Sequence, residues 1–410
     1  MNAVWRRVVW RTSACALIAL MGAVAGMAAA DAGPSPTSPT MPVQTVPLEF
    51  KDVPFAFFHV GIQVAERAAP FEKEPATKSK NVLRGTLEWG KSGSATNPPA
   101  FLWDRGAGRL YVDQNGNLDL TDDPAGCFVC ASGRGSSYQT FTNVHVPIAT
   151  KAGVRSTALD LSLYGGFGSP LYAFAGIRSL WLGKATFDGR EWQVGIFDSP
   201  SEQGAGGASR RLLLRPWAER EQSFQVGDGA ASVFTFATNV FVNGRAYKLV
   251  ATSTGARGQG GINLEFKEHQ RALGELRLDG QFIQRLALEG PSGLVLLDQP
   301  GSAAKVPLGR YTVESVRLRQ GGVEAIRTSP TTAAGVAVSE TGSGALAVGG
   351  PLTNSVSINR RGRTLVFNYQ LLGAGGETYR LYRPGQARQP PEFAIFRGET
   401  KIWSDRFEFG

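Results

Sequence analysis

The sequence has few histidines, cysteines and charged residues, and these shortages exclude several kinds of protein. Three histidines and three cysteines stand among 410 residues, and charged residues make up 19% of the chain. No serine-hydrolase elbow, His-Glu-x-x-His zinc motif or Cys–His pair of known kind occurs. The 51 glycines and 23 prolines instead favour a turn-rich β protein over a helical one.

Long apolar runs and basic runs are also missing. After residue 30 no apolar stretch approaches the ~18 residues that a membrane-spanning helix needs, so no such span is expected. The net charge is +9, and it falls to +6 without the three arginines of the first thirty residues. The other basic residues are scattered along the chain, so a nucleic-acid partner is not expected.

The first thirty residues have the pattern of a secretory signal peptide. Three arginines at the start precede an apolar stretch of small residues at 15–27, and 28–30 reads as an A-x-A cleavage site. The mature protein is therefore expected to be periplasmic or extracellular. Residues 31–47, rich in Pro, Ser and Thr, are predicted to form a flexible leader.

Beyond the leader, alternation of apolar and polar residues predicts strands. Leu159–Tyr164 alternates cleanly, which places one face of a strand in a core. An Asp-Gly pair at 188–189 and an Asn-Gly pair at 243–244 each separate two such stretches, and predict two-residue hairpin turns. Helical patterns are weak, with Gln203–Arg211 and Glu265–Leu273 as the candidates for short helices.

The chain after residue 272 shows short strands and turns at regular spacing, which favours a sandwich. Residues 307–311 read Pro-Leu-Gly-Arg-Tyr, which resembles the turn and strand of transthyretin-like and Cna-B-like sandwich modules. The prediction is therefore an all-β protein: an antiparallel β-rich N-terminal domain over 48–271, followed by an immunoglobulin-like or transthyretin-like β-sandwich over 272–410. A long loop is expected within the sandwich at about 328–351.

Residues 113–123 group oxygen-bearing side chains as a metal site would need. Hard cations such as Ca²⁺ are held by 6–8 oxygens of carboxylates, amides and carbonyls in a tight loop. The stretch resembles calcium-binding loops of the D-x-[DN]-x-[DN] kind, as in dockerins, thrombospondin type 3 repeats and EF-hands. Ca²⁺ is therefore the predicted cofactor, and its predicted ligands are Asp113, Asn115, Asn117, Asp119 and Asp122.

Two departures from the calcium-loop pattern support a second interpretation. Leu118 stands where a glycine is usual, and the loop is about two residues shorter than the twelve of an EF-hand. The alternative is a plain hairpin whose turn is Asn115-Gly116, with the acidic side chains facing solvent.

Cys127 and Cys130 are the only cysteines after residue 30. In an oxidising compartment such a pair predicts a disulfide. A thioredoxin-type redox centre would need a helix after the pair, whereas the flanking residues read as loop. Unpaired or metal-bound thiols are the remaining alternative.

Gly85–Ser92 matches the phosphate-loop pattern letter for letter. That pattern binds phosphate only between a strand and the start of a helix. Residues 85–89 alternate like a strand, and the Gly, Ser and Pro that follow do not start a helix. A strand without nucleotide binding is therefore predicted here.

No group of residues in the sequence indicates catalysis. The preferred interpretation is an exported, non-enzymatic β-sheet protein of the cell envelope with a binding or structural role, stabilised by calcium. Its expected partners are a cell-envelope polysaccharide or another envelope protein. The alternative is a carbohydrate-active enzyme or other hydrolase with dispersed carboxylates, or a glycan-binding module. Two carboxyl groups about 5–10 Å apart in a cleft would indicate the enzyme.

Overall fold

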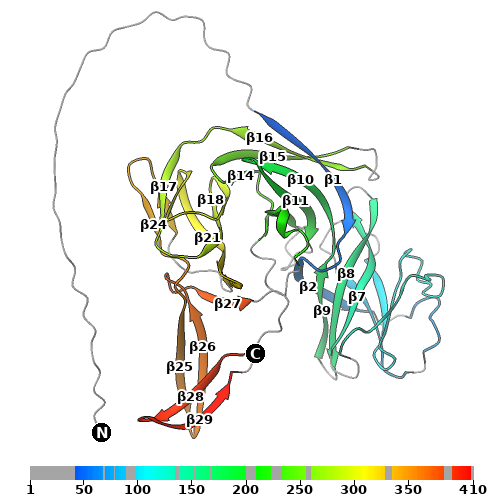
Figure 1. The fold of residues 1–410 in the computed structure, drawn as a ribbon. Coiled ribbons are helices and arrows are strands. Elements are labelled where there is room, and N and C mark those ends of the chain that lie inside the picture. The colour runs from blue at the N-terminus through cyan, green and yellow to red at the C-terminus, as the bar shows by residue number, and fades with distance from the viewer. Residues whose placement is uncertain are drawn as a thin grey trace, which may run out of the picture. The chain divides into compact units, whose positions relative to one another are not determined.

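The computed structural model describes residues 42–67, 70–77, 79–88, 98–133, 138–150, 153–166, 169–199, 209–222, 232–254, 260–327, 335–382 and 390–407. These residues form strands almost throughout, with one 3₁₀ turn, η1 (Trp217–Glu219), so the all-β prediction is confirmed (Figure 1). Among them, no helix has the length and apolar character to span a membrane. The predicted signal peptide lies outside the described residues.

An eight-stranded antiparallel sheet surrounds the first core. Its strands, in spatial order, are β6 (Cys127–Val129), β5 (Arg109–Val112), β4 (Ala100–Asp104), β3 (Val82–Glu88), β2 (Phe58–Glu66), β9 (Ser169–Ile177), β8 (Gly153–Gly166) and β7 (Tyr138–Thr150). The two ends of this sheet meet, because the N–H of Ala131, after β6, donates to the carbonyl of Thr140 in β7 at 2.7 Å.

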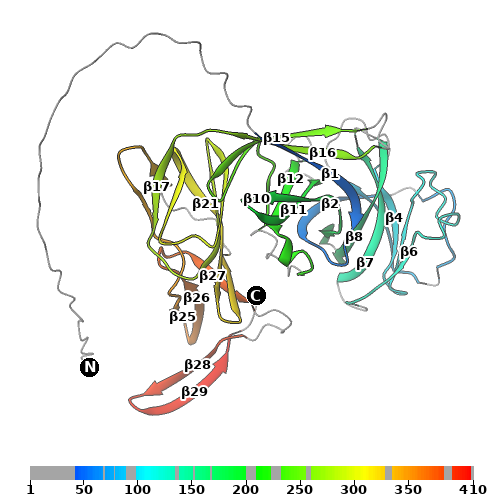
Figure 2. The ribbon, with the colours of Figure 1, turned by 45° about the horizontal axis from the view of Figure 1, so that its top comes forward.

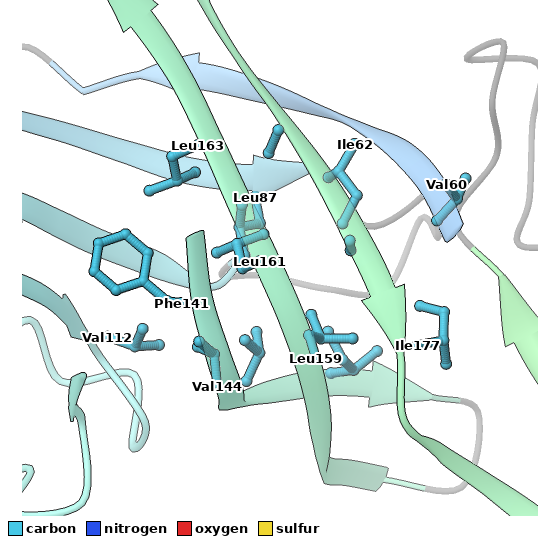
Figure 3. Close-up of a cluster of buried hydrophobic side chains, with 14 of the residues drawn as sticks. Val60, Ile62, Leu87, Val112, Phe141, Val144, Leu159, Leu161, Leu163 and Ile177 are labelled. Atoms are coloured by element: carbon cyan, nitrogen blue, oxygen red, sulfur yellow. The ribbon is translucent and has the colours of Figure 1, made fainter. Parts of the chain in front are cut away.

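Alternate side chains of this sheet fill its interior (Figure 3). In β8, Leu159, Leu161 and Leu163 are fully buried, whereas Tyr164 is on the outer face and only partly buried. The predicted alternation of this strand is thus confirmed. Each buried leucine contributes roughly 1.5–3 kcal/mol relative to an exposed one.

A second sheet of sixteen strands carries the rest of the chain. Its order is β13 (Val233–Thr235), β12 (Ser209–Pro216), β11 (Arg190–Ser199), β10 (Ser179–Phe187), β1 (Val43–Asp52), β16 (Ile262–His269), β15 (Arg245–Ser253), β14 (Asn239–Val242), β19 (Gly293–Asp298), β18 (Ile283–Gly290), β21 (Gly309–Gln320), β22 (Val323–Arg327), β27 (Thr378–Tyr382), β26 (Thr364–Leu372) and β25 (Thr353–Arg361), with β23 (Val336–Val338) on β21. Figure 2 shows the hairpin of β15 and β16 beside β1, with which β16 pairs.

Two small sheets complete the described chain. A three-stranded sheet has the order β20 (Ala303–Pro307), β17 (Leu273–Leu278) and β24 (Gly344–Leu346), and a hairpin joins β28 (Glu392–Arg397) to β29 (Thr400–Arg406). Leu276 of β17 and Val306 of β20 pack in one core with Leu288 of β18 and Val316 of β21. These two layers form a β-sandwich in the C-terminal part of the chain.

Both predicted hairpin turns are confirmed. Asp188 and Gly189 have φ of 50° and 72°, and Asn243 and Gly244 have φ of 43° and 100°. Positive φ at both central residues gives the turn the twist of the flanking strands, and Asp, Asn and Gly tolerate it best. The turn of the 307–311 motif is fixed by the buried Tyr311, whose hydroxyl donates to the carbonyl of Pro307 at 2.7 Å.

Four segments differ from the sequence predictions, and the first is the predicted helix Gln203–Arg211, whose described residues 209–211 belong to β12. β1 begins at Val43, so residues 43–47 of the predicted flexible leader are strand and pair with β16. Glu265–Leu273 is no helix, because its residues up to 269 belong to β16 and Leu273 begins β17. The predicted loop at 328–351 contains β23 and β24, and its residues 328–334 lie outside the described chain.

Main-chain and ionic contacts cross the predicted boundary at residue 272. β14 pairs with β19 in parallel. Glu219 of η1 accepts hydrogen bonds from the guanidinium groups of Arg285, at 3.0 and 3.2 Å, and of Arg317, at 2.8 Å. Arg285 also contacts Asp298, and Arg317 contacts Glu324. The five side chains form a buried ionic cluster that joins residues on both sides of position 272.

Candidate functional site

The acidic loop begins where β5 ends, and its first carboxylate is buried. Asp113 is 2% exposed, and its own N–H donates to the carbonyl of Ala100 in β4. One carboxylate oxygen accepts from the N–H of Gly116 at 2.7 Å and the other from the N–H of Leu118 at 3.1 Å. Asp113 therefore holds the loop in a tight turn around its own side chain.

Leu118 adopts the backbone conformation that the usual glycine would supply. Its φ is 64°, in the left-handed region that side chains with a Cβ rarely enter. The leucine side chain packs against a small apolar cluster that includes Phe71 and Leu102, and this burial offsets the strain. Leu118 thus forms the sharp turn for which calcium-binding loops usually have a glycine.

The asparagines and Asp122 complete the loop through hydrogen bonds within it. Each asparagine side-chain oxygen accepts from an N–H two residues on: Asn115 from Asn117 at 2.9 Å, and Asn117 from Asp119 at 2.7 Å. Their side-chain amides donate to the two carboxylate oxygens of Asp122, at 3.2 and 2.7 Å. The structure therefore brings Asn115, Asn117 and Asp122 together at the exposed side of the loop.

Asp119 is directed to a different partner. It accepts from the ammonium group of Lys73 at 2.7 Å and from the N–H of Thr121 at 2.9 Å. The Lys73 ammonium, followed by Thr121, lowers the pKa of Asp119 to about 2. Within the described chain, no three His, Cys, Asp or Glu side chains converge as a metal centre. An ion in this loop would thus depend on amide and carbonyl oxygens besides the carboxylates.

Two neighbours anchor the loop and were not among the predicted residues. Asp123 accepts from the N–H of Gln114 at 3.1 Å, and burial raises the pKa of Asp123. The side-chain amide of Gln114 donates to the carbonyls of Ala125 and of His145 in β7. The sequence offered no signal for the contact with β7, since it spans 31 positions.

The structure records Cys127 and Cys130 as free thiols, so the predicted disulfide is not formed in it. Cys127 begins β6, and the N–H of Cys130 continues the pairing by donating to the carbonyl of Gly108. Three extended steps separate the two Cα atoms by about 10 Å, beyond the roughly 7 Å that a disulfide can bridge. The thiol of Cys130 instead donates to the carbonyl of Ser132 at 2.9 Å.

The phosphate-loop lookalike is a strand over its described part. Residues 85–88 belong to β3, as predicted, and residue 89 lies outside the described chain. Gly85 is paired with Phe101, and a Cβ at this position would lie 2.7 Å from the Phe101 ring. The glycine therefore makes room for a core aromatic ring, which is a packing role.

A row of aromatic side chains lies on the outer face of the eight-stranded sheet and was not predicted from the sequence. Tyr138 of β7, Tyr164 of β8 and Tyr172 of β9 are direct cross-strand neighbours. Phe174 follows two positions after Tyr172 on the same face, with 47% of its surface exposed. Each tyrosine alternates with buried residues in its own strand, but only the register between strands brings them together.

A groove lies beside this row. It is open to solvent, with a volume of about 530 Å³, and lies over β2, β3 and β9. The residues that shape it include Gly61, Gln63, Glu88, Leu171, Tyr172 and Phe174.

Comparisons with known proteins supply no relative, since no family model, curated protein or solved structure matches this chain.

Proposed function

We propose that this chain is an exported, non-enzymatic β-sheet protein of the cell envelope with a binding or structural role, and that its acidic loop takes up Ca²⁺. The main support for a calcium site is the turn around Asp113, in which Leu118 has a φ of 64° and donates its N–H to the Asp113 carboxylate. A tight turn with oxygen-bearing side chains at alternate positions is how calcium loops gather their ligands.

Calcium would change the present hydrogen bonding in a defined way. Asp122 now accepts from the side-chain amides of Asn115 and Asn117. A cation between them would bind Asp122 and Asp113 and turn the two amide oxygens inward. Asp119 would join them only by leaving Lys73, so we expect weak binding, on the order of 10⁻⁴–10⁻³ M as in extracellular modules.

A binding role fits the outer groove better than a hydrolytic one does. Glu88 is the one carboxylate among the described residues that line it. A glycosidase of the usual kind needs a pair of carboxyl groups about 5–10 Å apart. The groove is therefore suited to holding a ligand without cleaving it.

Thermal unfolding in calcium tests the proposal. Ten-fold excess of Ca²⁺ over its Kd stabilises the native state by roughly 1.4 kcal/mol, because the ion binds only the folded chain. The melting temperature should therefore rise in about 10 mM Ca²⁺. The rise should vanish in Asp122→Asn, which keeps the side-chain shape, and in Asp113→Ala.

Glu275→Ala is the matched control, since Glu275 is an exposed acid on β17, outside the loop. It should keep the full rise in melting temperature. The comparison uses the calcium-induced change within each variant, because loss of the buried Asp113 lowers stability by itself. An unchanged melting curve of the wild-type protein would remove calcium from the proposed function.

A further inference from the structure

We propose that the groove between β2, β3 and β9 binds a neutral pyranose ring of a polysaccharide, stacked on the free face of Tyr172. This inference rests on the binding role proposed above and names its ligand, but it does not require calcium in the acidic loop. Four observations carry it: the register of the strands, the ring geometry, the floor of the groove and its charge.

The register places aromatic and polar side chains in one line across the sheet. Tyr138 pairs with Tyr164, Tyr164 with Tyr172, Tyr172 with Gln63, and Gln63 with Glu88. Each of the five has a buried neighbour in its own strand, so all five side chains lie on the outer face. The line therefore passes from three stacked rings to an amide and a carboxylate.

The ring geometry leaves one face of Tyr172 open to the groove. The rings of Tyr164 and Tyr172 stack with centroids 4.8 Å apart and planes inclined by 6°. Tyr138 covers the other side of Tyr164 at 5.5 Å and 20°. Tyr164 therefore covers one face of Tyr172, while the opposite face lines the groove, and Tyr172 keeps 45% of its surface exposed.

Phe174 and Gly61 form the second wall and the floor. The Phe174 ring stands nearly perpendicular to Tyr172, at 6.1 Å and 84°. Gly61 pairs with Phe174 across β2 and β9, and a Cβ there would touch only the Phe174 ring, at 3.8 Å. Because Gly61 has no side chain, the space beside the two rings stays open.

These walls match the two surfaces of a sugar ring. The C–H groups on one face of a pyranose carry partial positive charge and are attracted to the electron-rich face of an aromatic ring. Its hydroxyl groups extend from the ring edge, where the Gln63 amide can donate or accept hydrogen bonds and the Glu88 carboxylate can accept them. An apolar wall with a few placed polar groups is the usual composition of a small-ligand site.

The charge of the groove selects a neutral sugar. Among the described residues that line it there is no Lys or Arg, and Glu88 carries a negative charge. An acidic sugar would be repelled by Glu88 and would find no cation among these described residues. A second copy of this chain fits less well, since a stable interface needs roughly 800 Å² per partner, more than a groove lined by nine residues offers.

Isothermal titration in buffer with EDTA tests the inference separately from calcium. The probes are cellohexaose, maltohexaose and laminarihexaose as neutral glycans, with oligogalacturonate as the acidic comparison. At least one neutral probe should bind wild-type protein with a Kd below about 10 mM. Tyr172→Ala should weaken it about ten-fold or more, and Gly61→Leu, which fills the groove and keeps every aromatic ring, should abolish it.

Tyr138→Ala is the matched control, because it removes a similarly exposed tyrosine of the same stack that is not among the residues lining the groove. It should change the affinity by no more than about two-fold. The inference is overturned by absence of binding to all three neutral probes, by preference for oligogalacturonate, or by equal losses in Tyr138→Ala and Tyr172→Ala. Calcium-dependent melting with no glycan binding would leave the calcium proposal standing and reject this one.

Discussion

At the residue scale, Glu219 contacts two buried arginines at once. The side chain of Arg285 is 1% exposed and that of Arg317 is 7% exposed. Burial acts to raise the pKa of Glu219, but the two guanidinium groups outweigh it, so the pKa lies below its ordinary value. The charged form of Glu219 is therefore the one that the fold stabilises.

We expect Glu219→Gln to lower the free energy of unfolding by about 3–5 kcal/mol. The reason is that the buried Arg285 and Arg317 would then each keep a single carboxylate partner, Asp298 and Glu324 respectively. Urea unfolding followed by fluorescence measures the change. The control is Glu191→Gln, which breaks the exposed ion pair of Glu191 with Lys184 and should cost at most about 1 kcal/mol. Similar losses in the two variants would show that the buried cluster is not a source of stability.

Leu118 shows what the sequence can and cannot predict about a single residue. The missing glycine counted against a calcium loop, yet the chain takes the left-handed conformation with leucine. The cause is the packing of Leu118 against an apolar cluster whose most distant member in the sequence, Phe71, lies 47 positions earlier. Local patterns give the preferred conformation of a residue, whereas a distant packing partner can override that preference.

At the scale of elements, the pairing of β6 with β5 keeps the two cysteines too far apart to form a disulfide. Cys127 pairs with Tyr111, and the pairing of β6 with β5 keeps both cysteines extended. A disulfide between them would require the end of β6 to leave β5, because the Cα atoms lie too far apart in an extended strand.

We therefore expect alkylation of the natively folded protein to modify both thiols, with Cys127, the exposed one, reacting first. Mass spectrometry of the intact chain before and after reduction gives the count. A mass two hydrogens lower before reduction, with no alkylation, would mean that the disulfide forms and that β6 is not paired as described.

Local residue patterns predicted the hairpin turns, whereas the features that were not predicted depend on contacts between distant strands. The two hairpins at 188–189 and 243–244 follow from turn residues whose preference is local. The Glu265–Leu273 stretch was misjudged, because its first residues pair with β1 on one side and β15 on the other, and the sequence does not place these strands beside it. The aromatic row was missed for the same reason, since it depends on the register of three strands.

At the scale of the whole described chain, the sixteen-stranded sheet continues across residue 272. β14 before this position pairs with β19 after it, and Glu219 binds Arg285 and Arg317 across it. A chain that begins at residue 272 keeps the sandwich layers but loses both the neighbouring strand and the carboxylate.

We expect the fragment 272–410 to unfold at a lower temperature than the full chain, or to lack a cooperative transition, because β19 loses β14 and becomes an edge strand, and because two buried arginines lose Glu219. Circular dichroism during heating compares the fragment with the full chain. A fragment with the same midpoint as the full chain would show that 272–410 is an independent domain, as the sequence alone predicts.

Equilibrium dialysis against calcium shows whether the acidic loop binds one Ca²⁺, as proposed. We expect one ion per wild-type chain at saturation, with a Kd of roughly 10⁻⁴–10⁻³ M, and none in Asp122→Asn. Glu275→Ala should still bind one. Failure of the wild-type chain to bind calcium up to about 10 mM, or equal binding by Asp122→Asn, would contradict the proposal and leave residues 113–123 as a hydrogen-bonded turn.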